Sequence, residues 1–233
     1  MNQRSLTIVL LACGAIGPLL FIVTFLVEGA TRLGYSAWRH AVSQLSLGDL
    51  GWINSVGIIV CGLCILCFAI GLRRALGSGT GSVWGPLLAA VAGGCFVLLG
   101  IFPINPALGY PPGVPPSYSI HGLIHASAGT LFFGCISALC FVLGQRFAGD
   151  PAWRGRVLLS RITGLVVAGF YIAASLVTTL DMNGVLPDAP GGLLQRIAII
   201  SGFGWMALLV LWLVRGKQQA LASHVENVAT YEP

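Results

Sequence analysis

Six long apolar stretches, separated by short polar segments, dominate this chain of 233 residues. Each stretch is about 20 residues or longer, which is enough for a helix to cross the hydrocarbon core of a bilayer. Helices satisfy their own backbone hydrogen bonds, as lipid requires of any spanning segment. The pattern therefore predicts an all-α integral membrane bundle of six transmembrane helices, with spans at residues 6–27, 51–72, 83–102, 120–144, 157–180 and 194–214.

The segments outside these spans add smaller expectations. Trp38, Val42 and Leu45 recur at helical spacing ahead of the second span, which predicts a short interfacial helix there. Residues 103–119 are rich in proline and carry no charge. Residues 1–214 thus form one membrane domain, whereas residues 215–233 are polar and predict a disordered tail.

Composition supports lipid as the solvent of this chain. Hydrophobic residues make up 56% of it, charged residues only 8%, and the mean hydropathy is +0.90. Soluble domains carry about 25% charged residues. All seven cysteines lie inside apolar stretches, and an odd number of buried thiols argues against a disulfide framework. Cys61, Cys64 and Cys67 have the spacing of a ligand series, but on a helix in lipid we interpret them as small hydrophobic residues.

Basic residues distinguish the two sides of the membrane. The net charge is +5, but these residues cluster at the ends of apolar stretches, so they indicate orientation rather than a nucleic-acid partner. Arg32, Arg39 and Arg196 fall on the side opposite the termini. On the side of the termini lie Arg4, Arg73, Arg74, Arg146, Arg154, Arg156, Arg161, Arg215 and Lys217. Because cytoplasmic segments carry the excess of Lys and Arg, both termini and the polar tail are expected in the cytoplasm, with the chain in the cell membrane.

Histidines and one aspartate gather at the predicted non-cytoplasmic end, where they are the candidate catalytic residues. His121 and His125 are spaced i, i+4, so a helix could direct both imidazoles at one ion or substrate group. His40 would supply a third metal ligand, and Asp181 a further ligand or a base. Zinc is the candidate ion, because such a set lowers the pKa of bound water toward about 7 and makes it a nucleophile.

Three more polar residues could contact a substrate at the same end, namely Glu28, Ser43 and Asn105. Ser43 follows His40 by three residues, which allows a nucleophile with its base, although a local hydrogen bond or a helix cap is the favoured interpretation of this serine.

Structural interpretations compete for every one of these residues. The histidines could hydrogen-bond loop carbonyls, Asp181 could end a helix, and Glu28 could pair with a nearby arginine. A polar pocket without a metal is a further alternative.

Two motifs resemble a known family. The first is His40-Ala-Val-Ser-Gln-Leu-Ser-Leu-Gly48 with Gly51-Trp52, and the second is Gly100-Ile-Phe-Pro-Ile-Asn-Pro-Ala-Leu-Gly-Tyr-Pro-Pro-Gly113 with His121-Gly-Leu-Ile-His125. Together with six spans, they resemble the family of domain of unknown function 998 (DUF998). The resemblance implies a prokaryotic multi-spanning membrane protein with no established activity. The family often carries acidic residues where Asn105 and Ala126 stand, and losing both weakens a carboxylate-rich metal site.

Three classes of function therefore remain open from the sequence. The chain could be an intramembrane enzyme, with or without a metal, that acts on a lipid or another apolar substrate. It could instead be a binding or transport protein for a small molecule or lipid, with membrane lipid as its surroundings in either case. It could also be a structural accessory subunit.

Overall fold

The computed structural model describes the backbone of residues 2–149 and 154–229, and side chains as far as Arg215 except that of Arg154. Six long helices fill these ranges, and no β-strand occurs within them. A short 3-10 turn, η1, precedes the second long helix. The elements are α1 (Gln3–Thr31), η1 (Val42–Ser46), α2 (Gly51–Leu76), α3 (Trp84–Ile101), α4 (Ile120–Ala148), α5 (Arg154–Met182) and α6 (Gly191–Ala229).

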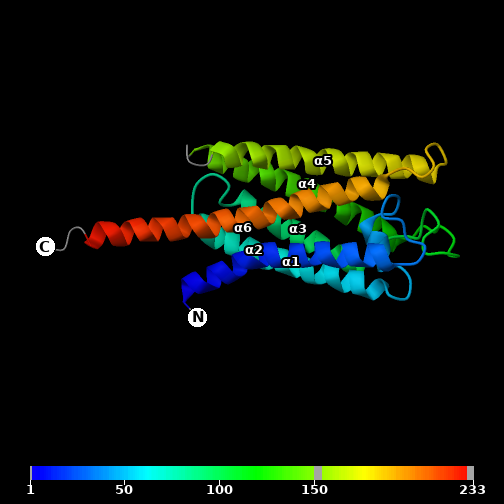
Figure 1. Cartoon of the computed structure of the whole chain (residues 1–233), viewed down its shortest axis with the longest axis horizontal. Coiled ribbons are helices and arrows are strands. Elements are labelled where there is room, and N and C mark those ends of the chain that lie inside the picture. The colour runs from blue at the N-terminus through cyan, green and yellow to red at the C-terminus, as the bar shows by residue number, and fades with distance from the viewer. Residues whose placement is uncertain (1, 150–153, 230–233) are drawn as a thin grey trace.

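All six predicted spans are confirmed as helices that are long and apolar enough to cross a membrane. The short helix expected before the second span is the turn η1, whose Val42 and Leu45 are buried against the bundle, while Trp38 lies outside it. The sequence predicts disorder from residue 215, whereas α6 continues as a helix through Ala229 (Figure 1). Extending a helix that already exists avoids the cost of nucleating a new one, and residues 215–229 contain no proline to stop it.

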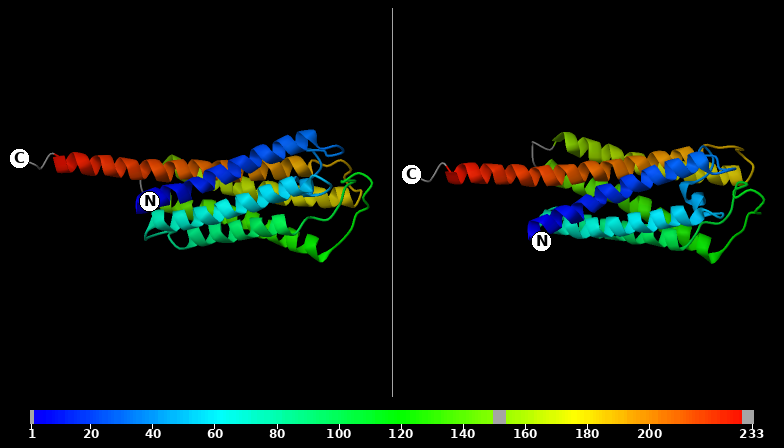
Figure 2. Two further views of the ribbon diagram at one scale, coloured as in Figure 1. Left: turned by 90° about the horizontal axis from the view of Figure 1, so that it is seen from below. Right: turned by 60° about the horizontal axis from the view of Figure 1, so that its bottom comes forward.

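The helices run alternately up and down and close into a ring (Figures 1 and 2). Each helix packs on its neighbours in sequence, and α6 packs on α1 to complete the ring. Short connections favour this arrangement, because consecutive antiparallel helices then lie side by side.

Phenylalanines from four helices fill the centre of the ring. Phe96 lies 5.3 Å from Phe21, 4.6 Å from Phe132 and 5.6 Å from Phe203, measured between ring centroids. Edge-to-face and tilted contacts of this kind are the favoured geometry for aromatic rings. The centre of the bundle is therefore packed with apolar side chains.

Glycines set the close approach of α2 and α3. A Cβ atom on Gly93 would lie 2.9 Å from the Gly62 carbonyl oxygen, and one on Gly62 would lie 2.8 Å from the Val97 backbone nitrogen. Only a residue without a side chain allows the two backbones to come this near, as is common between membrane helices.

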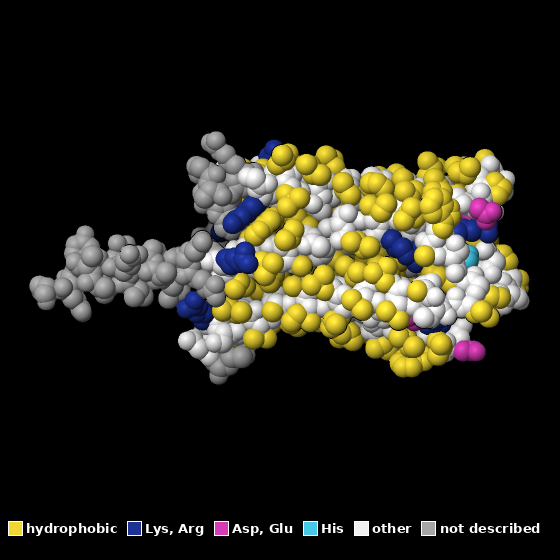
Figure 3. Space-filling model, in the orientation of Figure 1, with side chains coloured by type: hydrophobic (Ala, Val, Ile, Leu, Met, Phe, Trp, Pro, Cys, Tyr) yellow, Lys and Arg dark blue, Asp and Glu magenta, His cyan; other side chains and the backbone are white. Residues whose placement is uncertain are grey.

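The two ends of the bundle differ in chemistry. We call the end with both termini and residues 77–83 the terminal end, and the other the loop end. The loop end carries the connections at residues 32–50, 102–119 and 183–190. On the face seen in Figure 3, apolar side chains cover most of the length of the bundle, Lys and Arg lie toward both ends, and Asp and Glu lie at the loop end.

Candidate functional site

A buried arginine fastens residues 32–50 over the loop end. Arg196 lies in the first turns of α6 and is only 6% exposed. Its Nη1 donates to the carbonyl oxygens of Ala37 at 2.8 Å and His40 at 3.0 Å, and its Nη2 donates to the Tyr35 hydroxyl at 2.5 Å. A buried cation is stable only when its donors are satisfied, so these carbonyls are drawn against α6.

Tyr35 and His40 make further hydrogen bonds that hold residues 32–50 in place. Burial raises the pKa of Tyr35 to about 12, so the phenol stays protonated and donates to the Ala41 carbonyl at 3.0 Å. The His40 Nδ1 accepts from the Ser36 backbone N–H at 2.9 Å, which leaves the proton on Nε2, 3.2 Å from the Leu108 carbonyl oxygen. Burial lowers the pKa of His40, which favours the neutral ring that this pattern needs.

Asp181 forms an ion pair with Arg39. Its two oxygens accept from Arg39 Nε at 2.7 Å and Nη2 at 2.8 Å. Asp181 is 5% exposed, whereas Asp188, which lies 3.3 Å from Arg39 Nη1, has a side chain that is 82% exposed. A carboxylate at the C-terminal end of a helix opposes the helix dipole, and Arg39 offsets this. Asp181 therefore holds residues 32–50 to α5.

Glu28 and Asn105 also have partners of their own. Glu28 pairs with Arg32 at 2.5 Å, one turn along, as one sequence interpretation expects. Asn105 accepts from the Ser119 hydroxyl at 2.6 Å, and its amide packs so closely on Gly122 that a Cβ there would lie 2.1 Å away. Gly122, which lies between the two histidines of the motif, is thus required because any side chain there would collide with Asn105.

The histidines of α4 face different surroundings. His121 is exposed and lies against the Phe102 ring, with 5.6 Å between centroids. His125 is 5% exposed, and its Nδ1 lies 2.7 Å from the Phe102 carbonyl oxygen at the end of α3. The part of the chain that the structure describes holds no group of three or more His, Cys, Asp or Glu that could bind a metal. The zinc site predicted from His40, His121 and His125, with Asp181, therefore does not fit this geometry.

A different set of polar residues does converge, in a cavity of about 250 Å³ that we call the α4–α5 pocket. It lies at the loop end, with α6 and η1 contributing to its lining. Ala126 and Ser175 in its lining are exposed, whereas His125, Ala174 and Gly191 are buried, so the pocket reaches from the outer surface into the ring. The full lining is Ala41, Ser43, Ile104, His125, Ala126, Gly129, Phe133, Tyr171, Ala174, Ser175, Thr178, Gly191 and Gln195.

Several polar groups in this pocket have unused hydrogen-bonding capacity. Gln195 accepts from the Val42 backbone N–H through Oε1 at 2.8 Å. Within the described ranges, no hydrogen bond engages its amide nitrogen or the hydroxyls of Ser43 and Thr178. Since the His125 Nδ1–H faces a carbonyl, Nε2 is the lone-pair nitrogen of the neutral ring. The pocket can therefore offer both donors and acceptors to a ligand.

The pocket unites two predicted residues with others that sequence reasoning missed. Ser43 and His125 were candidates, whereas Gln195, Thr178 and Tyr171 were not. These three residues are hard to recognise from the sequence, because uncharged hydroxyl and amide side chains also occur in membrane spans where they only pack against neighbouring helices. Sequence reasoning also missed that Arg196 holds residues 32–50 in place, although an arginine inside an apolar span indicates that acceptors for its hydrogen bonds lie nearby.

Comparison with known families finds a match. The model of a family described as protein of unknown function (DUF998) matches residues 15–212. Comparisons with curated proteins and with solved structures find no match. The matched region includes all of the α4–α5 pocket and residues 32–50.

The two aspartates that face Arg39 provide a test of this fastening. Replacing Asp181 with Asn should lower the free energy of unfolding by about 1–3 kcal/mol, because it removes the buried carboxylate that accepts two hydrogen bonds from Arg39 and leaves this half-buried cation with only the exposed Asp188. Asp188→Asn should cost less than about 0.5 kcal/mol, because exposed pairs contribute little. Thermal or denaturant unfolding of the purified protein in detergent measures both. Equal effects of the two substitutions would contradict the fastening role of Asp181.

Proposed function

This chain belongs to the DUF998 family of membrane proteins, and we propose that it binds a neutral amphiphile in the α4–α5 pocket. The observation that carries the proposal is that the hydroxyls of Ser43 and Thr178 and the amide nitrogen of Gln195 line the pocket without a hydrogen-bond partner among the described residues. Polar groups facing a membrane-side cavity are costly unless something hydrogen-bonds to them. A ligand with hydroxyl or carbonyl groups would supply those bonds.

The lining argues for a ligand without charge. It contains no Asp, Glu, Lys or Arg, so a charged headgroup would find no countercharge at close range. Binding pockets for whole drug-sized ligands span about 300–1,000 Å³, and this cavity of about 250 Å³ lies just below that range. It fits a small polar head, with the rest of an amphiphile remaining in the bilayer.

Entry from the side of the bundle suits such a ligand. Small residues, Ala126, Gly129 and Ala174, line the pocket between α4 and α5. The exposed Thr130 and the Tyr171 hydroxyl, which lie 2.8 Å apart, continue the polar surface along these helices. A lipid-like molecule could thus place its head in the pocket while its chain stays against the outer surface.

Passage through the ring is a weaker alternative. A second cavity, of about 30 Å³, shares Ser43, Phe133 and Gln195 with the pocket and then meets Phe21 and Phe96. Those rings belong to the central aromatic cluster, which offers no polar groups to a solute. Binding therefore accounts for the pocket better than transport.

Hydrolysis is the second candidate function, because Ser43 and His125 line the same pocket. A serine hydroxyl and a neutral imidazole are the pair that nucleophilic catalysis requires. The His125 Nδ1–H is oriented by the Phe102 carbonyl, which would leave Nε2 to accept a proton. His40 is not available for this role, since backbone groups occupy both of its nitrogens.

The orientation that we propose places the α4–α5 pocket in the outer leaflet of the cell membrane. The support is the excess of Lys and Arg at the terminal end, which is the end expected in the cytoplasm. Residues 32–50 and the proline-rich segment would then face the outside.

Removing the unpaired hydroxyls should weaken ligand binding without weakening the fold. Ser43→Ala and Thr178→Val should each reduce labelling by a photoreactive monoacylglycerol roughly 2- to 12-fold, which corresponds to ~0.5–1.5 kcal/mol per hydrogen bond. The melting temperature should stay within the error of the wild type, because no protein group loses a partner. Peptide mapping of the crosslinked protein measures the labelling at this site.

Ser175→Ala is the matched control for these variants. Its hydroxyl lines the same pocket but already donates to the Tyr171 carbonyl at 2.9 Å, so labelling should be nearly unchanged. Wild-type protein that shows no saturable labelling would overturn the binding proposal. Labelling of wild type but not Ser43→Ala by a serine-directed fluorophosphonate would favour hydrolysis instead.

Reporter fusions test the proposed orientation. Green fluorescent protein fused after Pro233 should fluoresce, because it folds in the cytoplasm, whereas alkaline phosphatase at the same position should be inactive. Phosphatase fused after truncation within the segment of residues 111–118 should be active. The reverse pattern would show that the basic end faces outward.

A further inference from the structure

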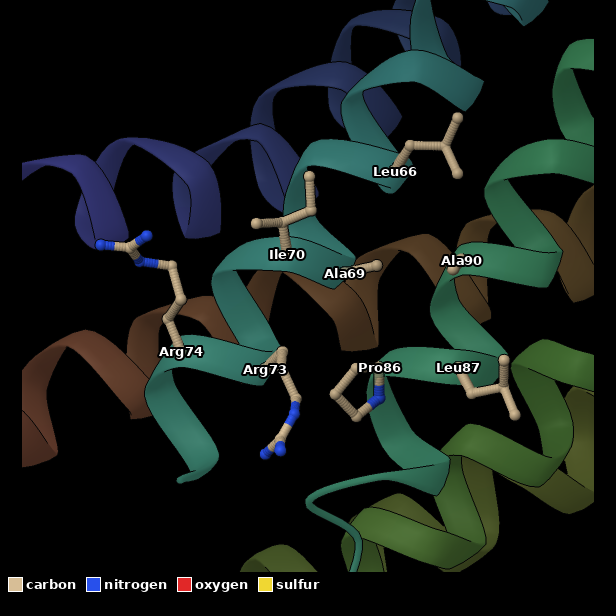
Figure 4. Close-up of a pocket in the computed structure, with 8 residues that line it drawn as sticks. All are labelled: Leu66, Ala69, Ile70, Arg73, Arg74, Pro86, Leu87 and Ala90. Carbon is tan, nitrogen blue, oxygen red and sulfur yellow. The ribbon is translucent and has the colours of Figure 1, made fainter. Parts of the chain in front are cut away.

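A second groove lies at the terminal end, between α2 and α3, far along the helices from the α4–α5 pocket. It has a volume of about 460 Å³ (Figure 4). Six apolar residues form its surface, and two arginines stand at its end. The lining is Leu66, Ala69, Ile70, Arg73, Arg74, Pro86, Leu87 and Ala90.

The shape of this groove follows from its side chains. Ala69 and Pro86 are buried and form a low floor, whereas Ile70 is 55% and Leu87 is 47% exposed. Beyond it, Gly62 and Gly93 hold α2 and α3 in close contact, so the small floor residues leave a channel between the two exposed walls. An apolar channel along the surface of a membrane bundle has the chemistry of an acyl chain site.

The two arginines differ in how many of their guanidinium donors already have hydrogen-bond partners. Arg74 is turned toward α1, where its Nε donates to the Thr7 hydroxyl at 3.1 Å and its Nη2 contacts Gln3 (Figure 4). Arg73 projects beside Pro86, and only its Nη1 is engaged, by the Gly77 carbonyl at 2.6 Å. Its other guanidinium nitrogens have no hydrogen bond within the described part of the chain. Arg73 therefore presents free donors at the end of an apolar groove.

We propose that this groove binds one anionic phospholipid, with an acyl chain between Ile70 and Leu87 and the phosphate on Arg73. A guanidinium suits this role, because its paired donors match the oxygens of a phosphate. Arg146, whose donors are taken by the carbonyls of Leu76, Ser78 and Thr80, adds positive charge nearby. The field therefore favours a lipid of net negative charge over a zwitterionic one. This site is independent of the α4–α5 pocket, whose lining carries no charge.

Native mass spectrometry of the full chain tests the site directly. Protein in a mild detergent is titrated with phosphatidylglycerol and, in parallel, with phosphatidylcholine. The wild type should retain one phosphatidylglycerol with roughly fivefold preference, the ratio that ~1 kcal/mol per arginine near an anionic lipid implies. Arg73→Gln should abolish that preference.

Two further variants separate this site from general attraction. Arg215→Gln removes the same charge from α6 at the same end and should keep the preference. Ala90→Leu places a larger side chain at a half-buried position in the groove lining without changing charge. It should lower the retention of phosphatidylglycerol at least threefold, with melting temperature confirming that the variant is folded. The proposal is overturned if Arg73→Gln keeps the preference, if Ala90→Leu leaves the retention of phosphatidylglycerol unchanged, or if Arg215→Gln loses the preference as fully as Arg73→Gln.

Discussion

The burial of the Arg196 guanidinium is the constraint on which the loop end depends. A charge in the first turns of a membrane helix must find acceptors, and here these are the carbonyls of Ala37 and His40 and the Tyr35 hydroxyl. These hydrogen bonds hold residues 35–41 against α6. The turn η1 follows immediately, so its position is set by the same contacts. Ser43 reaches the α4–α5 pocket because of them.

Other bonds reinforce the same placement from each side. Asp181 binds Arg39 from α5, the Gln195 amide oxygen binds Val42 from α6, and the Gln44 amide binds the Ala107 carbonyl in the proline-rich segment at 2.9 Å. Segments far apart in the sequence thus form one polar layer over an apolar ring. Ionisable residues in this layer are used mainly for structure. The groups left for a ligand are the uncharged ones beneath it.

The sequence alone predicted the six spans well, because every backbone polar group in lipid must be hydrogen-bonded within the protein. The site was harder to predict, for a definable reason. The i, i+4 spacing of His121 and His125 shows that they share a side of α4, but not which of the two the rest of the bundle covers. In the structure His125 is buried and His121 is exposed. Similarly, the sequence placed His40 and Asp181 at the same end of the bundle as the structure does, but it did not give their hydrogen-bond partners. These partners depend on the folded path of residues 32–50, and they are Ser36 and Leu108 for His40 and Arg39 for Asp181.

Opposite chemistry at the two ends is consistent with two kinds of lipid contact. The α4–α5 pocket has uncharged hydrogen-bonding groups, whereas the groove between α2 and α3 ends at a free guanidinium. The aromatic cluster of Phe21, Phe96, Phe132 and Phe203 fills the centre of the ring. Each surface is open to the side of the bundle, so each can exchange with the bilayer without opening the core.

Hydrogen exchange over residues 35–47 tests the central claim most directly. Their amides include those of Ser36, Ala41 and Val42, which donate to His40, Gln44 and Gln195 side chains. If Arg196 and its partners fix this segment, these amides should exchange at least about tenfold more slowly than those of Gly113 and Tyr118, which donate no hydrogen bond within the described part of the proline-rich segment, because protected amides exchange only when the structure opens locally. Exchange of both segments at the same unprotected rate would contradict the account.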